Sequence, residues 1–299
     1  MNNPDRLQAQ ASSFLGSAHL RKAALYGSLL AESDLQNLEE FGYLQTGARI
    51  EDGLENLYRE LSKEYRSEIV YKNRLARRFI SQGRGSGQRA FVQELRVADS
   101  ILDIASIGTQ VEALEIKTEY DNPDKLAKQL SDYWKIFPKV SIVCHESKVE
   151  LYSKRIANTP AGLIAMTDRC ALRRITKPSE NHSSLDVRTM VEALRKPEYS
   201  SIIERLFGRQ PAMPNTDHFR HHLDLALQAN PRLFARETAR QLRQRTPRLP
   251  ATIYRTLPES ILASSLRLDP SENQYRMIVN WLNYIGDKNV LSVSQGKAI

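Results

Sequence analysis

The strongest constraint on the fold of this chain is a change in the spacing of its apolar residues. Up to Ile80 they recur at helical spacing, whereas from Ala90 to Thr118 they follow a period of two. Three short segments carry the second pattern: AFVQELRV, SILDIASI and VEALEIKT. Gly108 and Thr109 separate the last two, as in a turn between antiparallel strands. The spacing therefore predicts three consecutive strands after a long helix.

Helical patterns lie on both sides of these strands. One helix is predicted from Leu54 to about Ile80, and another follows Pro123 in DKLAKQLSDYWKIF. KVSIVCH is a compact apolar segment typical of a strand, and GLIAM is a candidate for a further one. The order α-β-β-β-α-β predicts an α/β fold, with helices before this core and only helices after it.

These patterns divide the chain into three predicted segments. Residues 1–50 form an N-terminal helical segment, residues 51–170 contain the α/β core, and residues 185–299 form a helical C-terminal region interrupted by prolines. A chain of 299 residues can bury such a core, as one large domain or two of ordinary size.

Net charge indicates the kind of partner this protein binds, and cysteine content and apolar runs indicate its compartment. A formal net charge of +8 favours an anionic partner such as nucleic acid. Cys144 and Cys170 form neither a disulfide framework nor a zinc-binding spacing. The polar start MNNPDRLQAQ lacks the apolar core of a signal peptide, and no apolar run approaches the length of a membrane span. We therefore expect a soluble cytoplasmic protein that does not bind membranes.

Two opposite charges lie inside the third strand segment. On a strand, Glu115 and Lys117 point to one face, while Leu114 and Ile116 point to the other and pack on a core. Asp103 is the only charge in the preceding strand segment, and it would lie near Glu115 if the two strands form a hairpin. The two carboxylates then suit Mg²⁺, which prefers oxygen ligands. The alternative is a surface ion pair between Glu115 and Lys117.

Two further acids are candidate metal ligands. Asp99 is an alternative to Asp103, although it fits better in the turn before the strand. Glu68 lies seven residues from both Leu61 and Leu75, on a predicted apolar helix face. A buried carboxylate requires a cation or hydrogen-bond donors, and a metal ion shared with Asp103 would supply one. The alternative is an ion pair with Lys72, four residues along the helix.

At these residues the chain resembles the PD-(D/E)XK nuclease superfamily and, within it, the RecB-like subgroup. Asp103 and the run Glu115-Ile116-Lys117 match the superfamily motif, with leucine before the aspartate in place of proline. Glu68 matches an acid on the first helix, and Gln129 and Tyr133 match a Q-x-x-x-Y motif on the later one. The resemblance covers roughly residues 54–166 and extends to uncharacterised bacterial and phage proteins with this core.

The resemblance implies a restriction-endonuclease-like core that hydrolyses phosphodiester bonds. It implies DNA as the favoured substrate and Mg²⁺ or Mn²⁺ as the cofactor. Its implied metal ligands are Asp103, Glu115, Glu68 and the backbone carbonyl of Ile116. Lys117 would stabilise developing charge and orient the attacking water. Gln129 and Tyr133, on one helix face, would steady that lysine or the DNA backbone. The family context implies a bacterial or phage DNA transaction or a phage-defence role.

Basic residues in two regions are candidate phosphate contacts. The first set lies at the end of the first core helix and in the loop and strand after it: Lys72, Arg77, Arg84, Arg89 and Arg96. The second is a stripe at helical spacing in the C-terminal region, where Arg236 and Arg240 lie between Arg232 and Arg243. The alternative is a solvated charged face or, for the stripe, an interface with a protein partner or a second copy.

Two other functions stay open at this point. One is a catalytically idle nuclease-like fold that binds nucleic acid or a protein partner, and the other is an RNA-cleaving, toxin-like nuclease. Aromatic residues make up only 7% of the chain and form no obvious stacking platform for single-stranded RNA or DNA, which favours a duplex or a substrate read through its backbone. Glu146 and Lys148 repeat the acid-x-lysine spacing, but they follow the end of a strand and are interpreted as surface residues.

Overall fold

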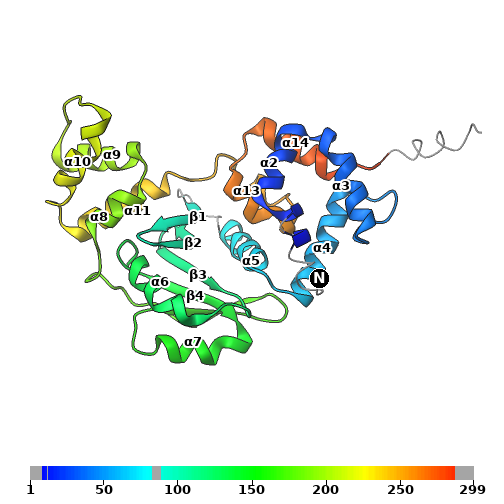
Figure 1. The fold of residues 1–299 in the computed structure, drawn as a ribbon, viewed down its shortest axis with the longest axis horizontal. Helices are drawn as coiled ribbons and strands as arrows, with labels where there is room; N and C mark the ends of the chain where they lie inside the picture. Colours follow the sequence, from blue (N-terminus) through cyan, green and yellow to red (C-terminus); the bar gives the residue numbers. More distant parts are fainter. Residues whose placement is uncertain (1–8, 12, 83–88, 287–299) are drawn as a thin grey trace, which may run out of the picture. The chain divides into compact units, whose positions relative to one another are not determined.

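A computed structural model describes residues 9–11, 13–82 and 89–286 of the chain (Figure 1). The chain divides into two compact units. The sheet unit comprises Arg78–Pro247, and the terminal unit combines Met1–Arg77 with Arg248–Ile299. This division differs from the three consecutive segments predicted, because the C-terminal helices belong to both units.

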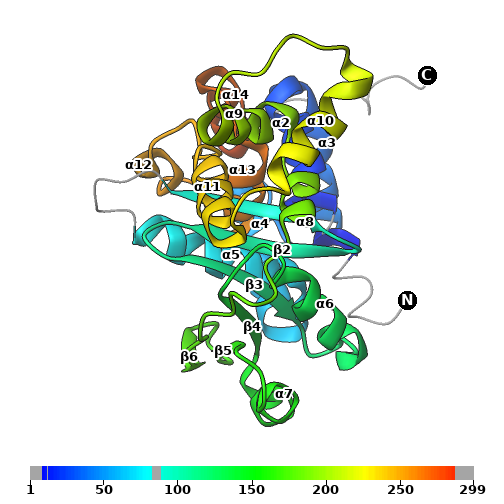
Figure 2. The same ribbon diagram turned by 90° about the vertical axis from the view of Figure 1, so that its left-hand side faces the viewer.

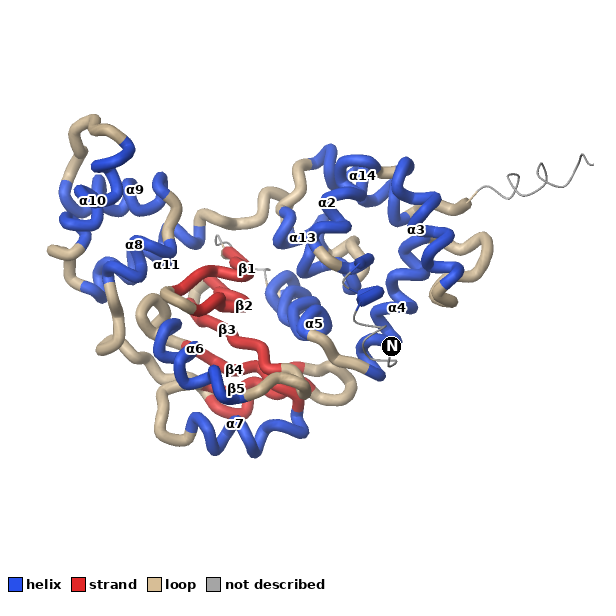
Figure 3. Tube along the Cα trace, in the orientation of Figure 1, coloured by secondary structure: helices blue, strands red, loops and turns tan. Residues whose placement is uncertain are grey.

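A six-stranded mixed sheet organises the sheet unit, with its strands in chain order. The strands are β1 (Ala90–Val97), β2 (Ser100–Ile107), β3 (Val111–Lys117), β4 (Val140–His145), β5 (Gly162–Met166) and β6 (Leu172–Thr176). The pairs β1–β2, β2–β3 and β5–β6 are antiparallel, whereas β3, β4 and β5 run parallel. Figure 3 shows β1 to β5 in red, side by side in this order. The predicted strands are confirmed, GLIAM is β5, and β6 was not predicted.

Helices of the sheet unit build its core, some against the sheet and some against other helices. They are α6 (Leu126–Tyr133) after the 3₁₀ turn η1 (Pro123–Lys125), α7 (Val149–Ile156) after η2 (Glu146–Lys148), α8 (Val187–Ala193), α9 (Lys196–Phe207), α10 (Asn215–Ala226) and α11 (Pro231–Arg243). One buried apolar cluster joins these helices to strands β1 to β5. Helix α6 packs on β2, and α7 packs on β4 and β5 (Figure 2). The order α5-β1-β2-β3-α6-β4 confirms the predicted α/β core.

The terminal unit consists of helices from both ends of the chain. They are α2 (Ser17–Tyr26), α3 (Ser28–Glu40), α4 (Ile50–Glu64), the first part of α5 (Glu68–Ser81), α12 (Ala251–Tyr254), η3 (Glu259–Ile261), α13 (Leu262–Leu268) and α14 (Glu272–Leu282). The buried carboxylate of Asp34 accepts a hydrogen bond from Trp281 Nε1 at 2.8 Å and lies 3.0 Å from His19 Nε2. This contact joins α14 to α2 and α3, which explains why distant segments form one unit.

The single helix predicted from Leu54 to Ile80 is wrong, because it is two helices. Helix α4 ends at Glu64, and α5 begins at Glu68. Between them Tyr65 has φ −152° and ψ 90°, an extended conformation that ends a helix. Leu61, Glu68 and Leu75 therefore do not share a helix face.

None of the helices in the described part of the chain combines the length and the apolar character that crossing a bilayer requires.

Candidate active site

Asp103 reaches β3 where the backbone ladder between β2 and β3 stops. The paired residues run from Ile107↔Val111 to Ile104↔Leu114. Immediately beyond the last backbone pair, a side chain bonds to β3 instead of the backbone: Asp103 Oδ2 accepts a 2.7 Å hydrogen bond from the backbone N–H of Ile116. Strand β3 continues instead beside β4, with which it pairs as far as Lys117. The predicted proximity of Asp103 to the Glu115–Lys117 segment is therefore present.

A local distortion of the strands directs Asp103 to this position. Leu102 before it and Ala105 after it both belong to the same buried cluster, although residues three apart on a regular strand point to opposite faces. On the neighbouring strand, Glu94 has φ 53°, a left-handed conformation that is rare for residues other than glycine. Such irregularities re-aim side chains and are frequent beside active sites.

Glu115 and Lys117 form a buried ion pair. Their residues are 2% and 6% exposed, and Lys117 Nζ lies 2.8 Å from Glu115 Oε1. The alternative of a surface ion pair is wrong, because both side chains are covered by protein. Removing two charges from water costs several kcal/mol per ion, so the pair requires additional hydrogen bonds.

Helix α6 supplies those hydrogen bonds. Gln129 Nε2 donates to Glu115 Oε1 at 2.5 Å, and Gln129 Oε1 accepts from Lys117 Nζ at 2.8 Å. Tyr133, one turn later on the same face, donates to Glu115 Oε2, with Oη 2.7 Å away. Burial and the charges of Glu115 and Asp103 raise the pKa of Tyr133, which keeps its hydroxyl protonated as a donor. The predicted Gln129 and Tyr133 thus contact the acid–lysine pair directly.

A second buried acid, Asp132, holds α6 in place, and the sequence analysis did not predict this role. Asp132 accepts hydrogen bonds from Lys128, Lys135 and Ser100, all at 2.8 Å. Burial acts to raise the pKa of Asp132, but these hydrogen bonds outweigh it and lower that pKa to about 2. Since Ser100 begins β2, the contact fixes α6 against the strand that carries Asp103. The clue in the sequence was an acid between Lys128 and Lys135 at helical spacing.

The residues in this cluster fit a hard divalent cation by their chemistry. Asp103 and Glu115 offer carboxylate oxygens, which Mg²⁺ and Mn²⁺ prefer. An ion at Glu115 would compete with the ammonium group of Lys117 for the same carboxylate. The role of the Ile116 carbonyl as a ligand stays a prediction.

The comparison with known families falls on this part of the chain. The model of the family described as bacteriophage P4 protein cII matches residues 61–245, more than half of the 299 residues. The chain belongs to that family. The matched segment includes the whole sheet and helices α6 to α11, and therefore every residue of the cluster. Neither the curated proteins nor the solved structures gave a significant match.

In this P4 cII family member, Glu68 does not belong to the same unit as Asp103 and Glu115. It lies in the first turn of α5 with its side chain 49% exposed, and Lys72 Nζ is 2.5 Å from its Oε1. The predicted buried position of Glu68 is wrong because the helix is interrupted before it. The alternative, an ion pair with Lys72, is confirmed.

Several predicted phosphate contacts of the first basic set have intramolecular partners. Arg77 Nη2 donates to the Leu257 carbonyl at 3.3 Å. Arg89 stacks on the Phe79 ring, with its guanidinium carbon 4.6 Å from the ring centroid, and burial lowers its pKa. Arg96 is exposed on β1, and Arg84 lies outside the described residues.

The arginines of α11 line a cavity of about 420 Å³. Arg236 and Arg240 lie on its wall with Arg232 and Arg243, facing Val111 at the start of β3. Val111 precedes Glu115 by four residues, about 13 Å along the strand. The predicted stripe therefore forms the wall of a hollow in the unit that contains the acid–lysine cluster.

Proposed function

We propose that this member of the P4 cII family is a metal-dependent nuclease that hydrolyses phosphodiester bonds of DNA. The observation that carries the proposal is the convergence of Asp103 with a buried Glu115–Lys117 pair whose hydrogen bonds come from Gln129 and Tyr133. The same residue types occur in the PD-(D/E)XK nucleases that the sequence resembles, which supports the proposal independently of the family match.

Burial of the pair is itself an argument for function. Ion pairs in protein interiors contribute little net stability, and well-packed apolar residues of similar volume often stabilise more. Here a carboxylate, an ammonium, an amide and a phenol share one buried cluster between β3 and α6. A requirement for charge at this place explains the arrangement better than stability does.

In the proposed mechanism Asp103 and Glu115 would hold Mg²⁺ or Mn²⁺, with the Ile116 carbonyl as a further ligand. The bound ion would supply activation of water and stabilisation of the leaving oxygen. Lys117 would direct its ammonium toward the phosphate and the attacking water, where it would stabilise negative charge. Gln129 keeps a hydrogen bond to that ammonium, and Tyr133 keeps Glu115 oriented.

DNA is the proposed substrate, in a phage or bacterial DNA transaction or in defence against phage. The net charge of +8 attracts a polyanion, and Arg236 and Arg240 on the cavity wall would contact backbone phosphates. Arginine suits this role because its planar fork binds phosphate oxygens in pairs. We also propose the cytoplasm as the site of action, because there the protein would meet phage or bacterial DNA.

One observation favours a second candidate, a nuclease-like fold that only binds nucleic acid. Glu115 and Lys117 are almost completely covered, so substrate and metal reach them only after local movement. A binding protein would need no such movement.

Isosteric substitution of Asp103 tests the proposal. Asp103→Asn keeps an oxygen that can accept from Ile116 N–H but removes the charge that a metal requires. We expect cleavage of DNA with Mg²⁺ or Mn²⁺ by the wild-type chain, abolished by chelation, and a loss of about 100-fold or more in the variant. Asp99→Asn makes the same chemical change on an exposed turn residue and should leave the rate unchanged.

The assay includes double-stranded DNA, single-stranded DNA and RNA. Cleavage confined to RNA would support the toxin-like alternative. If the folded chain binds nucleic acid without metal and does not cleave it, the nuclease proposal is overturned in favour of the binding protein. Equal loss in both aspartate variants would remove the special role of Asp103.

A further inference from the structure

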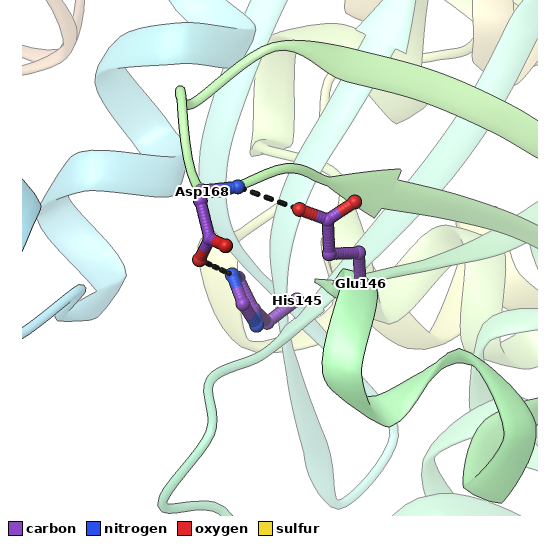
Figure 4. Close-up of side chains that lie close together, drawn as sticks. All are labelled: His145, Glu146 and Asp168. Atoms are coloured by element: carbon purple, nitrogen blue, oxygen red, sulfur yellow. Dashed lines mark hydrogen bonds and ion pairs between the residues drawn. The ribbon is translucent and has the colours of Figure 1, made fainter.

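A second cluster of metal-binding side chains lies where the parallel strands end. His145 is the last residue of β4 and pairs with Met166 at the end of β5. Glu146 follows it, and Asp168 lies two residues beyond β5. Ligand atoms of His145, Glu146 and Asp168 all lie within 4.8 Å of one another (Figure 4). Carboxyl ends of parallel strands are a common location for ligand sites in α/β proteins.

The imidazole of His145 is an independent observation that points to a ligand at this place. The residue is only 3% exposed. Its Nδ1 lies 2.9 Å from Ser147 Oγ and accepts a 3.3 Å hydrogen bond from the Ser147 backbone N–H. Its Nε2 is buried and has no hydrogen-bond partner among the described residues, although Asp168 Oδ1 lies 3.2 Å away. Buried polar atoms without hydrogen bonds are rare, so this nitrogen requires an explanation.

The distances match those between ligands of one metal ion. Two atoms about 2.1 Å from an ion at the tetrahedral angle are about 3.4 Å apart. The separation of 3.2 Å between His145 Nε2 and Asp168 Oδ1 is close to that value. Glu146 already contacts the Asp168 segment, because its Oε1 accepts from Asp168 N–H at 2.8 Å. We propose that His145 Nε2, Asp168 and Glu146 bind one divalent transition-metal ion.

Glu119 completes the arrangement as a positioning residue. Its Oε1 lies 3.2 Å from His145 Nδ1, on the opposite side of the ring from Asp168. A histidine that binds metal through one nitrogen usually donates its other N–H to a carboxylate or carbonyl, which fixes the tautomer and raises ligand basicity. Metal at Nε2 would place the proton on Nδ1, which would then donate to Glu119 in place of accepting from the Ser147 backbone N–H.

The ligand set selects the class of ion. One imidazole with two carboxylates suits Zn²⁺ or Mn²⁺ better than Mg²⁺, which rarely takes nitrogen ligands. The side chain of Asp168 is 75% exposed, which gives the ion an entry path. The site shares no residue with the Asp103–Glu115 cluster and does not depend on the proposed nuclease activity. It would link the segments that follow β3, β4 and β5.

Zinc binding to the full chain tests the site. The measurements use the Asp103→Asn background, which weakens the first candidate metal site, so the two proposals fail separately. Titration calorimetry with Zn²⁺ alone should give one site, and Zn²⁺ in 100-fold excess over its Kd should raise Tm by about 5 °C or more. Asp168→Asn, a change at an exposed side chain, should weaken binding at least about tenfold.

Further variants distinguish residues that bind or orient the metal ligands from nearby residues that do not. His145→Gln should abolish binding, Glu119→Gln should weaken it about tenfold, and Glu150→Gln on exposed α7 should have no effect. Co²⁺ should give the absorption bands of a low-symmetry site in the Asp103→Asn chain but not with Asp168→Asn added. Unchanged zinc affinity in Asp168→Asn, or the absence of a single zinc site, would overturn the proposal and leave His145 as an ion-pair partner of Glu119 and Asp168.

Discussion

Two acid–lysine pairs in this chain have the same chemistry and different surroundings. Lys117 lies 2.8 Å from Glu115 in the sheet unit, and Lys72 lies 2.5 Å from Glu68 in the terminal unit. Glu115 is buried and accepts from an amide and a phenol as well, whereas Glu68 is half exposed in a first helical turn. Distance alone does not distinguish them. The additional buried donors mark the pair that requires its charge, and the sequence had assigned both acids to one site.

The largest difference between the pairs should emerge when each lysine is replaced. Lys117→Met leaves the carboxylate of Glu115 buried without its cation, which should destabilise the sheet unit by about 3–5 kcal/mol. Adding Glu115→Gln should recover much of this loss, because no buried charge remains. Urea unfolding followed by tryptophan fluorescence measures both losses. A single-variant loss below about 1 kcal/mol would show that the buried and exposed pairs do not differ.

Acid should weaken the anchoring of the helix that gives the buried pair its extra donors. The pKa of Asp132 is lowered to about 2 in the folded chain, below its ordinary value. A group with a depressed pKa stabilises the fold above its unfolded pKa, and the contribution is lost as pH falls toward the folded pKa. Stability should therefore drop between about pH 4 and pH 2, by about 2 kcal/mol from this group.

Asp132→Asn isolates that contribution. The variant should be less stable at pH 7 by a similar amount and should show a flatter loss between pH 4 and pH 2, measured by unfolding at each pH. Asp99→Asn, at an exposed acid that shares Lys128 with Asp132, is the control and should keep the wild-type slope. An unchanged slope in Asp132→Asn would mean that other carboxylates produce the acid dependence.

The smallest effect is expected at the Glu68–Lys72 pair, whose carboxylate is half exposed. Lys72→Met should change the stability of the terminal unit by less than about 1 kcal/mol, because Glu68 then turns to water. Urea unfolding followed by Trp281 fluorescence in a Trp134→Phe background measures it. A loss comparable to that of Lys117→Met would contradict the comparison.

The core of the candidate site was predictable because its signals are local. Alternation along β2 and β3 placed Asp103, Glu115 and Lys117 on neighbouring strands, and spacing of four residues placed Gln129 and Tyr133 on one face of α6. These patterns depend on backbone geometry, which the residues themselves impose.

Features that depend on distant partners were missed. The interruption at Tyr65 separates Glu68 from the helix face it was assigned to, and no glycine or proline marks it. Strand β6 has few apolar residues, because an edge strand pairs on one side only. Glu146 is a surface residue as predicted, but its contact with Asp168 beside His145 was not predicted. The contact between Glu146 and Asp168 joins residues 22 apart in the sequence, which local spacing does not predict.

By itself, the sequence determined the order of the strands and helices in the core and the residue types that converge on β3. Apolar periodicity fixes which side of a strand or helix is covered, whatever covers it. Tertiary structure alone decided which acids lose contact with water and that α14 joins α2 and α3. Burial of a charge depends on hydrogen-bond partners that folding brings together, such as Tyr133 at Glu115 and Trp281 at Asp34. The local spacing of residues does not predict such contacts.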